Sequence, residues 1–173
     1  QESPETPLRE GKGERYYGGI FRLNESEYIK NLFPHNITDV YSYRVAAQIY
    51  EGLFKFDDAN LRVINGLAEN HTIDESGTVY TIKLKEQVYF HDDPCFEDGK
   101  GRELTAEDVK YSFTRLCTQN INNQLFSSLF KNILKGANAY YEASAGGNVP
   151  DFEVEGIRVL DAITATALAL SSA

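Results

Sequence analysis

The segment from Gly66 to Cys117 constrains the fold most, because its pattern predicts a strand hairpin, a long loop and a capped helix in succession. Residues 79–85 alternate between the two faces of a strand, and the apolar face carries Tyr80, Ile82 and Leu84. A period of two is typical of a strand with one buried side. The preceding residues 74–77, Asp-Glu-Ser-Gly, favour a turn, since Asp and Ser bond nearby backbone groups and glycine adopts positive φ readily.

The helix that follows the loop begins with a recognisable cap. Thr105 is the expected N-cap, and Asp108 stands three residues later, as in a capping box. Val109, Phe113 and Leu116 then recur at the spacing of one helical face. The hairpin and this helix together predict a mixed α/β fold in which the helix packs on a sheet.

Four blocks of this chain carry a family resemblance through their order and spacing. They are Gly-Leu-Ala-Glu at 66–69, Tyr-Thr at 80–81, Val-Tyr-Phe-His-Asp at 88–92, and Leu-Thr-Ala-Glu-Asp-Val-Lys-Tyr-Ser-Phe at 104–113. The chain resembles the extracytoplasmic solute-binding proteins of oligopeptide, dipeptide and nickel ABC importers. The resemblance implies an α/β fold, the N-terminal portion of a two-lobed periplasmic-binding-protein-like (class II) fold. Members of that family are several hundred residues long, so the chain is expected to cover about the first third of one.

The expected organisation has three parts. Residues 1–15 are polar and proline-bearing and are expected to form a flexible leader. Residues 16–161 are expected to form the N-terminal lobe portion, with a strand at 16–24 and helices at 42–54 and 125–134. Residues 162–173 are alanine-rich where relatives have a charged turn and an apolar strand, and they remain unassigned.

Charge excludes some classes of partner. The formal net charge is −9 and the isoelectric point about 4.8, whereas nucleic acids and anionic membranes are bound by basic faces. No apolar run approaches the roughly 20 residues that span a bilayer. The family resemblance implies an extracytoplasmic location, as a periplasmic protein or a membrane-anchored lipoprotein whose anchor lies outside this sequence.

The two cysteines, Cys95 and Cys117, lie in the long loop and at the end of the following helix. We expect a disulfide that closes a loop of about twenty residues, which stabilises by about 3 kcal/mol in the chain-entropy model. Two free thiols and a reactive cysteine are the alternatives. His91 lies near Cys95, but the spaced pairs of a zinc site are missing from the sequence, so no metal and no cofactor are expected.

The resemblance also places candidate ligand contacts in two segments. The loop after the first strand faces the ligand cleft in relatives, and residues between the two later helices lie near bound peptide. The candidates in this chain are Asn24, Glu25, Ser26, Tyr28, Asn122, Asn123 and Gln124. A carboxylate of the first segment, Glu25 or Glu27, is a candidate partner for a ligand α-ammonium, and an exposed acidic loop is the alternative.

The function implied by the resemblance is binding without catalysis. Oligopeptides or dipeptides would be captured between two lobes and delivered to the permease subunits of an ABC importer, by a full-length protein that is a monomer. The alternatives are a non-peptide solute (a metal chelate, haem or a sugar), a sensor module on the same fold, and an enzyme that uses the cysteine and histidine residues.

Overall fold

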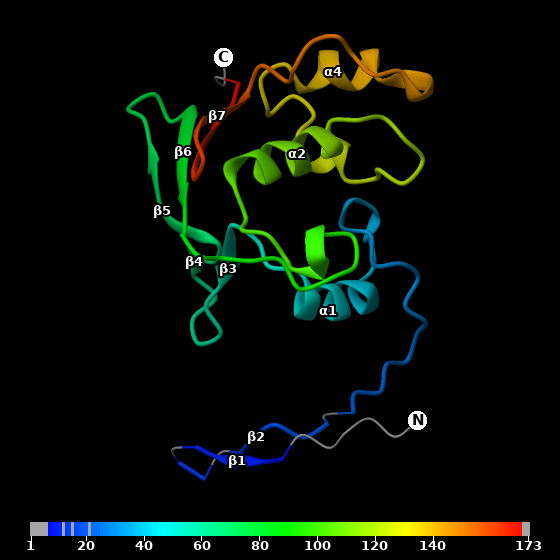
Figure 1. Cartoon of the computed structure of the whole chain (residues 1–173). Coiled ribbons are helices and arrows are strands. Elements are labelled where there is room, and N and C mark those ends of the chain that lie inside the picture. The colour runs from blue at the N-terminus through cyan, green and yellow to red at the C-terminus, as the bar shows by residue number, and fades with distance from the viewer. Residues whose placement is uncertain (1–6, 12, 15, 21, 171–173) are drawn as a thin grey trace.

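The largest sheet of the molecule is antiparallel and has four strands. The computed structural model describes residues 7–11, 13–14, 16–20 and 22–170. The strands are β5 (Ala68–Ile73), β6 (Val79–Leu84), β7 (Ile157–Asp161) and β8 (Thr164–Leu168), in the order β5-β6-β8-β7. Figure 1 shows helix α2 (Ala106–Leu116) running beside this sheet. The mixed α/β architecture is confirmed.

The hairpin β5–β6 forms where the alternating pattern predicts it. Ile82 and Leu84 are buried, and Tyr80, at the outer end of the strand, is 38% exposed. The turn before β6 is held by Asp74, whose Oδ1 accepts hydrogen bonds from the backbone N–H groups of Thr78 and Val79 at 2.9 and 2.8 Å. Gly77 takes a φ of 72°, the left-handed conformation that glycine adopts at little cost.

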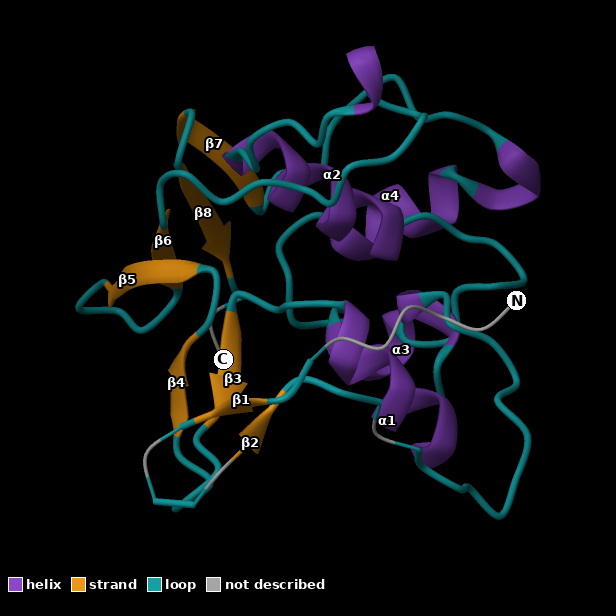
Figure 2. Cartoon of the chain, turned by 60° about the horizontal axis from the view of Figure 1, so that its bottom comes forward, coloured by secondary structure: helices purple, strands orange, loops and turns teal. Residues whose placement is uncertain are grey.

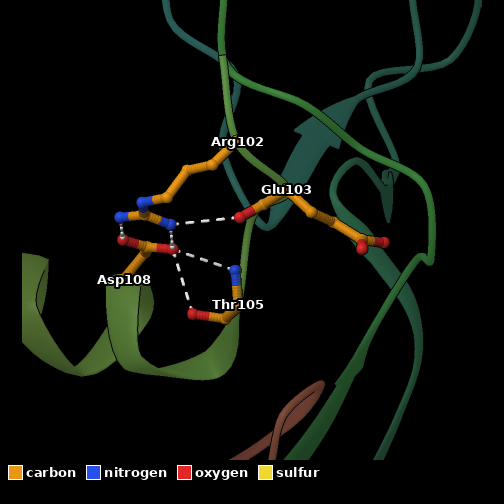
Figure 3. A network of polar contacts seen from close by, with 4 residues as sticks. All are labelled: Arg102, Glu103, Thr105 and Asp108. Atoms are coloured by element: carbon orange, nitrogen blue, oxygen red, sulfur yellow. Dashed lines mark hydrogen bonds and ion pairs between the residues drawn. The ribbon is translucent and has the colours of Figure 1, made fainter. Parts of the chain in front are cut away.

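The capping box at the start of α2 is confirmed and extended by an arginine (Figure 3). Asp108 Oδ2 accepts from the backbone N–H of Thr105 at 2.9 Å and from Arg102 Nη1 at 2.7 Å. Arg102 Nη1 also donates to the carbonyl of Glu103 at 3.0 Å. The long loop is thereby tied to the first turn of the helix. Behind the cap, Ala106 and Val109 pack in one core cluster with buried side chains of the sheet.

A second core cluster lies at the far end of α2. It joins Cys117 and Phe126 to α4 (Ala137–Ala143) and β7, through Tyr140 and Ile157. The helix expected at residues 125–134 is reduced to α3 (Phe126–Leu129). Asn132 adopts a φ of 60°, which a continuous α-helix excludes.

Residues beyond Asn132 pair with the end of the sheet instead of continuing a helix. The N–H of Lys135 donates to the carbonyl of Leu168 at 3.0 Å, and the N–H of Leu170 donates to that of Ile133 at 2.7 Å. The tail that sequence left unassigned therefore contains β8, which pairs with both β6 and β7. The folded unit does not end at residue 161.

The N-terminal third contributes smaller elements (Figures 1 and 2). Helix α1 (Val40–Ile49) begins two residues before the expected start, because the Asp39 side chain caps it by accepting from Ser42 N–H at 2.9 Å. Two short hairpins lie here, and single 3-10 turns occur along the chain. The hairpin strands are β1 (Arg9–Glu10), β2 (Tyr16–Tyr17), β3 (Phe54–Phe56) and β4 (Val63–Asn65), and the 3-10 turns are Pro34–Asn36, Glu97–Gly99 and Ala145–Gly147.

Two expectations for the N-terminus differ from the structure. The strand expected at 16–24 is confined to β2, and residues 22–24 form no strand. Within the expected leader, β1 pairs with β2 across residues 9–10 and 16–17, while residues 1–6, 12 and 15 lie outside the described part of the chain. None of the described helices is long and apolar enough to cross a membrane.

The expected disulfide is wrong: both cysteines are free, with Cys95 exposed and Cys117 fully buried. The cause is the length of α2. The loop that carries Cys95 is tied through Arg102 to the first turn of the helix, whereas Cys117 is its C-cap. The 11 residues of α2 span about 16 Å, and a disulfide needs Cα atoms about 5.5–6 Å apart.

Candidate functional site

The first predicted ligand segment is fixed on helix α1 by three polar contacts. Ser26 Oγ donates to the hydroxyl oxygen of Tyr41 at 3.1 Å, and the backbone N–H of Lys30 donates to Ser42 Oγ at 3.1 Å. Ser42 is fully buried, so the second contact anchors the segment to the interior of the fold. The third contact is the ion pair between Glu25 and Arg44. Residues 24–30 are therefore held against α1 although they form no helix or strand.

Glu25 and Tyr28 differ in how available they are to a ligand. Arg44 Nη1 donates to Glu25 Oε2 at 3.0 Å, and the glutamate side chain is only 13% exposed while that of Arg44 is 56% exposed. The charge of Glu25 is therefore already balanced inside the protein. Tyr28 is 90% exposed and Asn24 is also exposed, so both present their side chains to solvent.

The second predicted segment has one buried residue between two exposed ones. Asn123 is buried, and its Nδ2 donates to the carbonyls of Leu116 and Thr118, both at 2.7 Å. Its Oδ1 accepts from the N–H of Phe126 at 3.3 Å. All of these bonds hold the loop after α2 to the start of α3, which is a structural role. Asn122 and Gln124 flank it and are exposed.

The second segment lies against the turn before α1. The backbone N–H of Gln124 donates to the carbonyl of His35 at 3.1 Å, which links the loop after α2 to the turn before α1. Beside this link lies an open hollow of about 450 Å³. Its lining is Ile37, Thr38, Asp39, Val40, Tyr43 and Leu125. This hollow is the candidate functional site: Gln124 directly precedes its lining residue Leu125, and the first segment is held on α1, the helix that supplies Val40 and Tyr43 to the lining.

The hollow combines apolar walls with one carboxylate. Hydrogen bonding from the backbone N–H of Ser42 lowers the pKa of Asp39, so this side chain is an anion at neutral pH. Burial, with a smaller contribution from Arg115, lowers the pKa of His35, so the imidazole at the rim is neutral. Sequence reasoning missed Thr38, Asp39 and Tyr43. The N-cap preference of Asp just before an apolar-periodic run was the signal that would have found Asp39.

Metal and nucleophile chemistry find no support in the described residues. Within the ranges given above, no three His, Cys, Asp or Glu side chains are grouped to hold a metal ion. Burial raises the pKa of Cys117 to about 12, and hydrogen bonding to the Asp93 carboxylate raises that of Cys95. Both shifts disfavour the thiolate, which is the nucleophilic form. Neither cysteine is therefore activated as a nucleophile.

Comparison with known proteins decides the family. Residues 62–165 match the family described as bacterial extracellular solute-binding proteins, family 5 Middle. The chain belongs to this family. The chain is also similar to the glutathione-binding protein GsiB of Escherichia coli K12, with 34% identical residues over 104 aligned positions. That match covers 60% of the chain and 18% of GsiB.

Solved structures extend the similarity of the chain beyond the segment that matches the family. Listeria monocytogenes OppA bound to peptide is 27% identical with a TM-score of 0.66, over 84% of the chain and 26% of OppA. The oligopeptide-binding protein OppAIV from Borrelia burgdorferi is 25% identical with a TM-score of 0.62, over 80% of the chain and 25% of that protein. The family resemblance and the fold class are confirmed, and the chain spans about a quarter or less of the length of these relatives.

Proposed function

We propose that the chain is the N-terminal part of an extracytoplasmic solute-binding protein that captures oligopeptides or dipeptides for an ABC importer. The observation that carries the proposal is the similarity to Listeria monocytogenes OppA bound to peptide, together with the family 5 match. The GsiB relative is named for glutathione, which is itself a short peptide-like molecule. The protein would lie outside the cytoplasm, in the periplasm or anchored as a lipoprotein, and would hand its ligand to permease subunits.

The candidate site offers groups that suit a peptide. The exposed Asn122 and Gln124 lie just before Leu125 of the hollow, and Asn24, Ser26 and Tyr28, in the segment held on α1, supply further hydrogen-bonding groups and one aromatic surface. Amide and hydroxyl groups can satisfy the repeating main-chain donors and acceptors of a peptide without reading its side chains. Asn123 would support the loop from behind, because its amide is already hydrogen-bonded.

Charge recognition in this site would fall to Asp39 more than to Glu25. The Glu25 carboxylate is engaged by Arg44, and a ligand ammonium would have to compete with that guanidinium. Asp39 lines the hollow and stays ionised. The α-ammonium group of a peptide is the cation that all unmodified peptides share, so a single carboxylate would orient ligands of many sequences.

Capture would follow from closure of two lobes on the ligand. A ligand stabilises the closed state by its difference in affinity for the open and closed conformations. The chain contains the candidate contacts of one side only, since it spans 26% of Listeria monocytogenes OppA. No chemical step is required of any residue. The full-length protein would act as a monomer and would need no cofactor.

Native mass spectrometry of the gently purified full-length protein tests this function. Bound solutes are then released by denaturation and identified by mass. A series of short peptide masses is the expected result. A single mass that corresponds to a metal chelate, haem or a sugar would replace the peptide assignment, and a protein that stays empty when offered mixed peptides would favour a sensor module.

A further inference from the structure

A second cavity lies between helices α3 and α4 and the loop that follows α2. Its volume is about 200 Å³, and it shares no lining residue with the hollow beside α1. In Figure 2 both helices lie to the right of the labelled strands. The lining consists of the buried Phe126 and six polar side chains, Gln119, Ser127, Lys131, Asn138, Tyr141 and Glu142. We call this space the α3–α4 cavity.

Contacts between its walls hold the α3–α4 cavity in shape. The amide of Asn138, on α4, bonds to Asn132 in both directions: its Nδ2 donates to Asn132 Oδ1 at 2.6 Å, and its Oδ1 accepts from the Asn132 N–H at 3.1 Å. The rings of Phe126 and Tyr141 stack with their centroids 4.0 Å apart and their planes 4° from parallel. These contacts join α3 and the turn after it to α4. The cavity is therefore largely preformed, as small-molecule sites usually are.

The polar side-chain ends that line this cavity are not used by the fold. Gln119 is anchored through its backbone, whose N–H donates to Oγ of the buried Ser144 at 2.8 Å, and this bond leaves its side-chain amide available. Among the described residues, no ion pair includes Lys131 or Glu142. The cavity thus presents one positive and one negative side chain that do not neutralise each other, with the hydroxyl of Ser127 between other polar groups.

We propose that the α3–α4 cavity binds a small α-amino acid, with the ligand carboxylate beside Lys131 and the ligand ammonium beside Glu142. A zwitterion is the one small ligand that supplies a counter-charge to both side chains at once. Phosphate or another simple anion would be repelled by Glu142, and a neutral sugar would leave both charges without a counter-charge. The volume lies below the roughly 300–1,000 Å³ of sites for drug-sized ligands, which favours a single amino acid over a peptide.

This site goes beyond the proposed function and does not depend on it. The lining of the hollow contains one carboxylate, Asp39, and no lysine or arginine, whereas the α3–α4 cavity contains a charge of each sign. All of the lining residues belong to this chain, so the cavity needs no contribution from a second lobe. The two sites meet only at the start of α3, where Leu125 lines the hollow and Phe126 lines the cavity.

Isothermal titration of the full-length protein with glycine, alanine and serine tests the inference through the two charges of the ligand. At least one of them should bind with a dissociation constant of about 1 mM or lower. Its amide lacks the carboxylate and its N-acetyl form lacks the ammonium. Each derivative should bind about tenfold more weakly, because each loses one charge-assisted hydrogen bond. No binding of any of the three at about 10 mM, or equal binding of an amino acid and its two derivatives, would overturn the inference.

Two variants assign the two ligand charges to their partners. Lys131→Gln should abolish the difference between the amino acid and its amide, and Glu142→Gln should abolish the difference between the amino acid and its N-acetyl form. Both side chains are exposed, so the variants should fold like the wild type, which circular dichroism checks. Lys55→Gln and Glu75→Gln, at exposed positions outside the cavity, are the matched controls and should bind like the wild type. Unchanged discrimination in both cavity variants would mean that the amino acid binds elsewhere.

The variant Asp39→Asn distinguishes this site from the proposed peptide site. Amino-acid binding that persists in Asp39→Asn and weakens in Lys131→Gln supports a separate site. The opposite pattern would place the amino acid in the hollow, and the inference would be wrong. Peptide capture is measured separately, by the masses of the solutes released from the full-length protein. Each proposal can therefore fail while the other holds.

Discussion

At the scale of single residues, Asp108 joins the long loop to α2 through two kinds of bond. Its carboxylate accepts from the N-cap residue Thr105 and from Arg102. Asp108→Asn removes the ion pair and weakens the cap, and we expect it to lower the free energy of unfolding by about 1 kcal/mol. Chemical denaturation at pH 7 measures this. Asp151→Asn, at an exposed position, is the control and should change the stability little.

The effect of Asp108→Asn should depend on pH with a defined sign. The Arg102 side chain, with hydrogen bonds from Thr105, lowers the pKa of Asp108 from its ordinary value of 3.8. A lowered pKa stabilises the folded state fully above the ordinary value, and this stabilisation is lost as pH falls through the folded pKa. Unfolding curves of the wild type and the variant should therefore begin to converge only as the pH falls below about 4. A constant difference from pH 7 to pH 3 would exclude the ionised pair as the cause.

The two cysteines should differ sharply in reactivity. Burial raises the pKa of Cys117 to about 12, so only about one molecule in 10⁴ carries this thiolate at pH 8, whereas Cys95 is exposed. A thiol reagent should modify one cysteine per native chain and two after denaturation. Cys95→Ser should abolish the native reaction. A chain that reacts only after reduction would instead contain the disulfide.

At the scale of elements, β8 is the strand on which the sheet depends. It lies between β6 and β7 and contributes the buried Ala165 and Thr166. Removal of residues 162–173 would leave β7 without a partner and β6 paired only with β5, and it would open the core cluster beneath α2. We expect the truncated chain to lose cooperative thermal unfolding, as followed by circular dichroism. Removal of residues 171–173 alone should preserve it.

Local patterns allowed part of this fold to be predicted. The β5–β6 hairpin and the cap of α2 each depend on residues close in sequence, and each was found. β8 was missed because residues 164–167 alternate threonine with alanine, which gives too little contrast in hydrophobicity to indicate a buried face. The segment becomes a strand through its pairing with β6, which lies far away in the sequence. The helix expected at 125–134 failed for the same reason, since pairing of Lys135 with Leu168 overrides the helical pattern.

The candidate site, like the fold, was predicted from the sequence only in part. The family resemblance indicated the segments around Tyr28 and Gln124, and the structure brings the second against the turn at His35. Their roles as ligand contacts remain predictions. Asp39 was missed because the helix was expected to begin at residue 42, although its N-cap position was a usable signal, and because its place in the hollow depends on Leu125, far along the chain. The engagement of Glu25 by Arg44, 19 residues along the chain, could not be read from either residue alone.

At the scale of the whole molecule, binding strength should reveal how much of the ligand site the chain contains. A ligand held between two closing lobes is contacted from both sides, and closure supplies its differential affinity. The hollow of the chain is open to solvent and belongs to one side. We expect peptides to bind the full-length protein at least about 100-fold more tightly than the chain, which corresponds to about 2.7 kcal/mol of lost contact.

Isothermal titration with one peptide identified from the full-length protein measures both affinities under the same conditions. A scrambled peptide of equal charge controls for non-specific attraction to a chain of net charge −9. Equal affinities would mean that the hollow lined by Asp39, Tyr43 and Leu125 is a complete site, and closure would then serve delivery to the permease without contributing to capture. The chain alone could instead bind peptide weakly and lose this binding in the variant Asp39→Asn. That result would assign the Asp39 carboxylate to the half of the site that the chain supplies. The substitution removes the negative charge but keeps a side chain that can still cap α1.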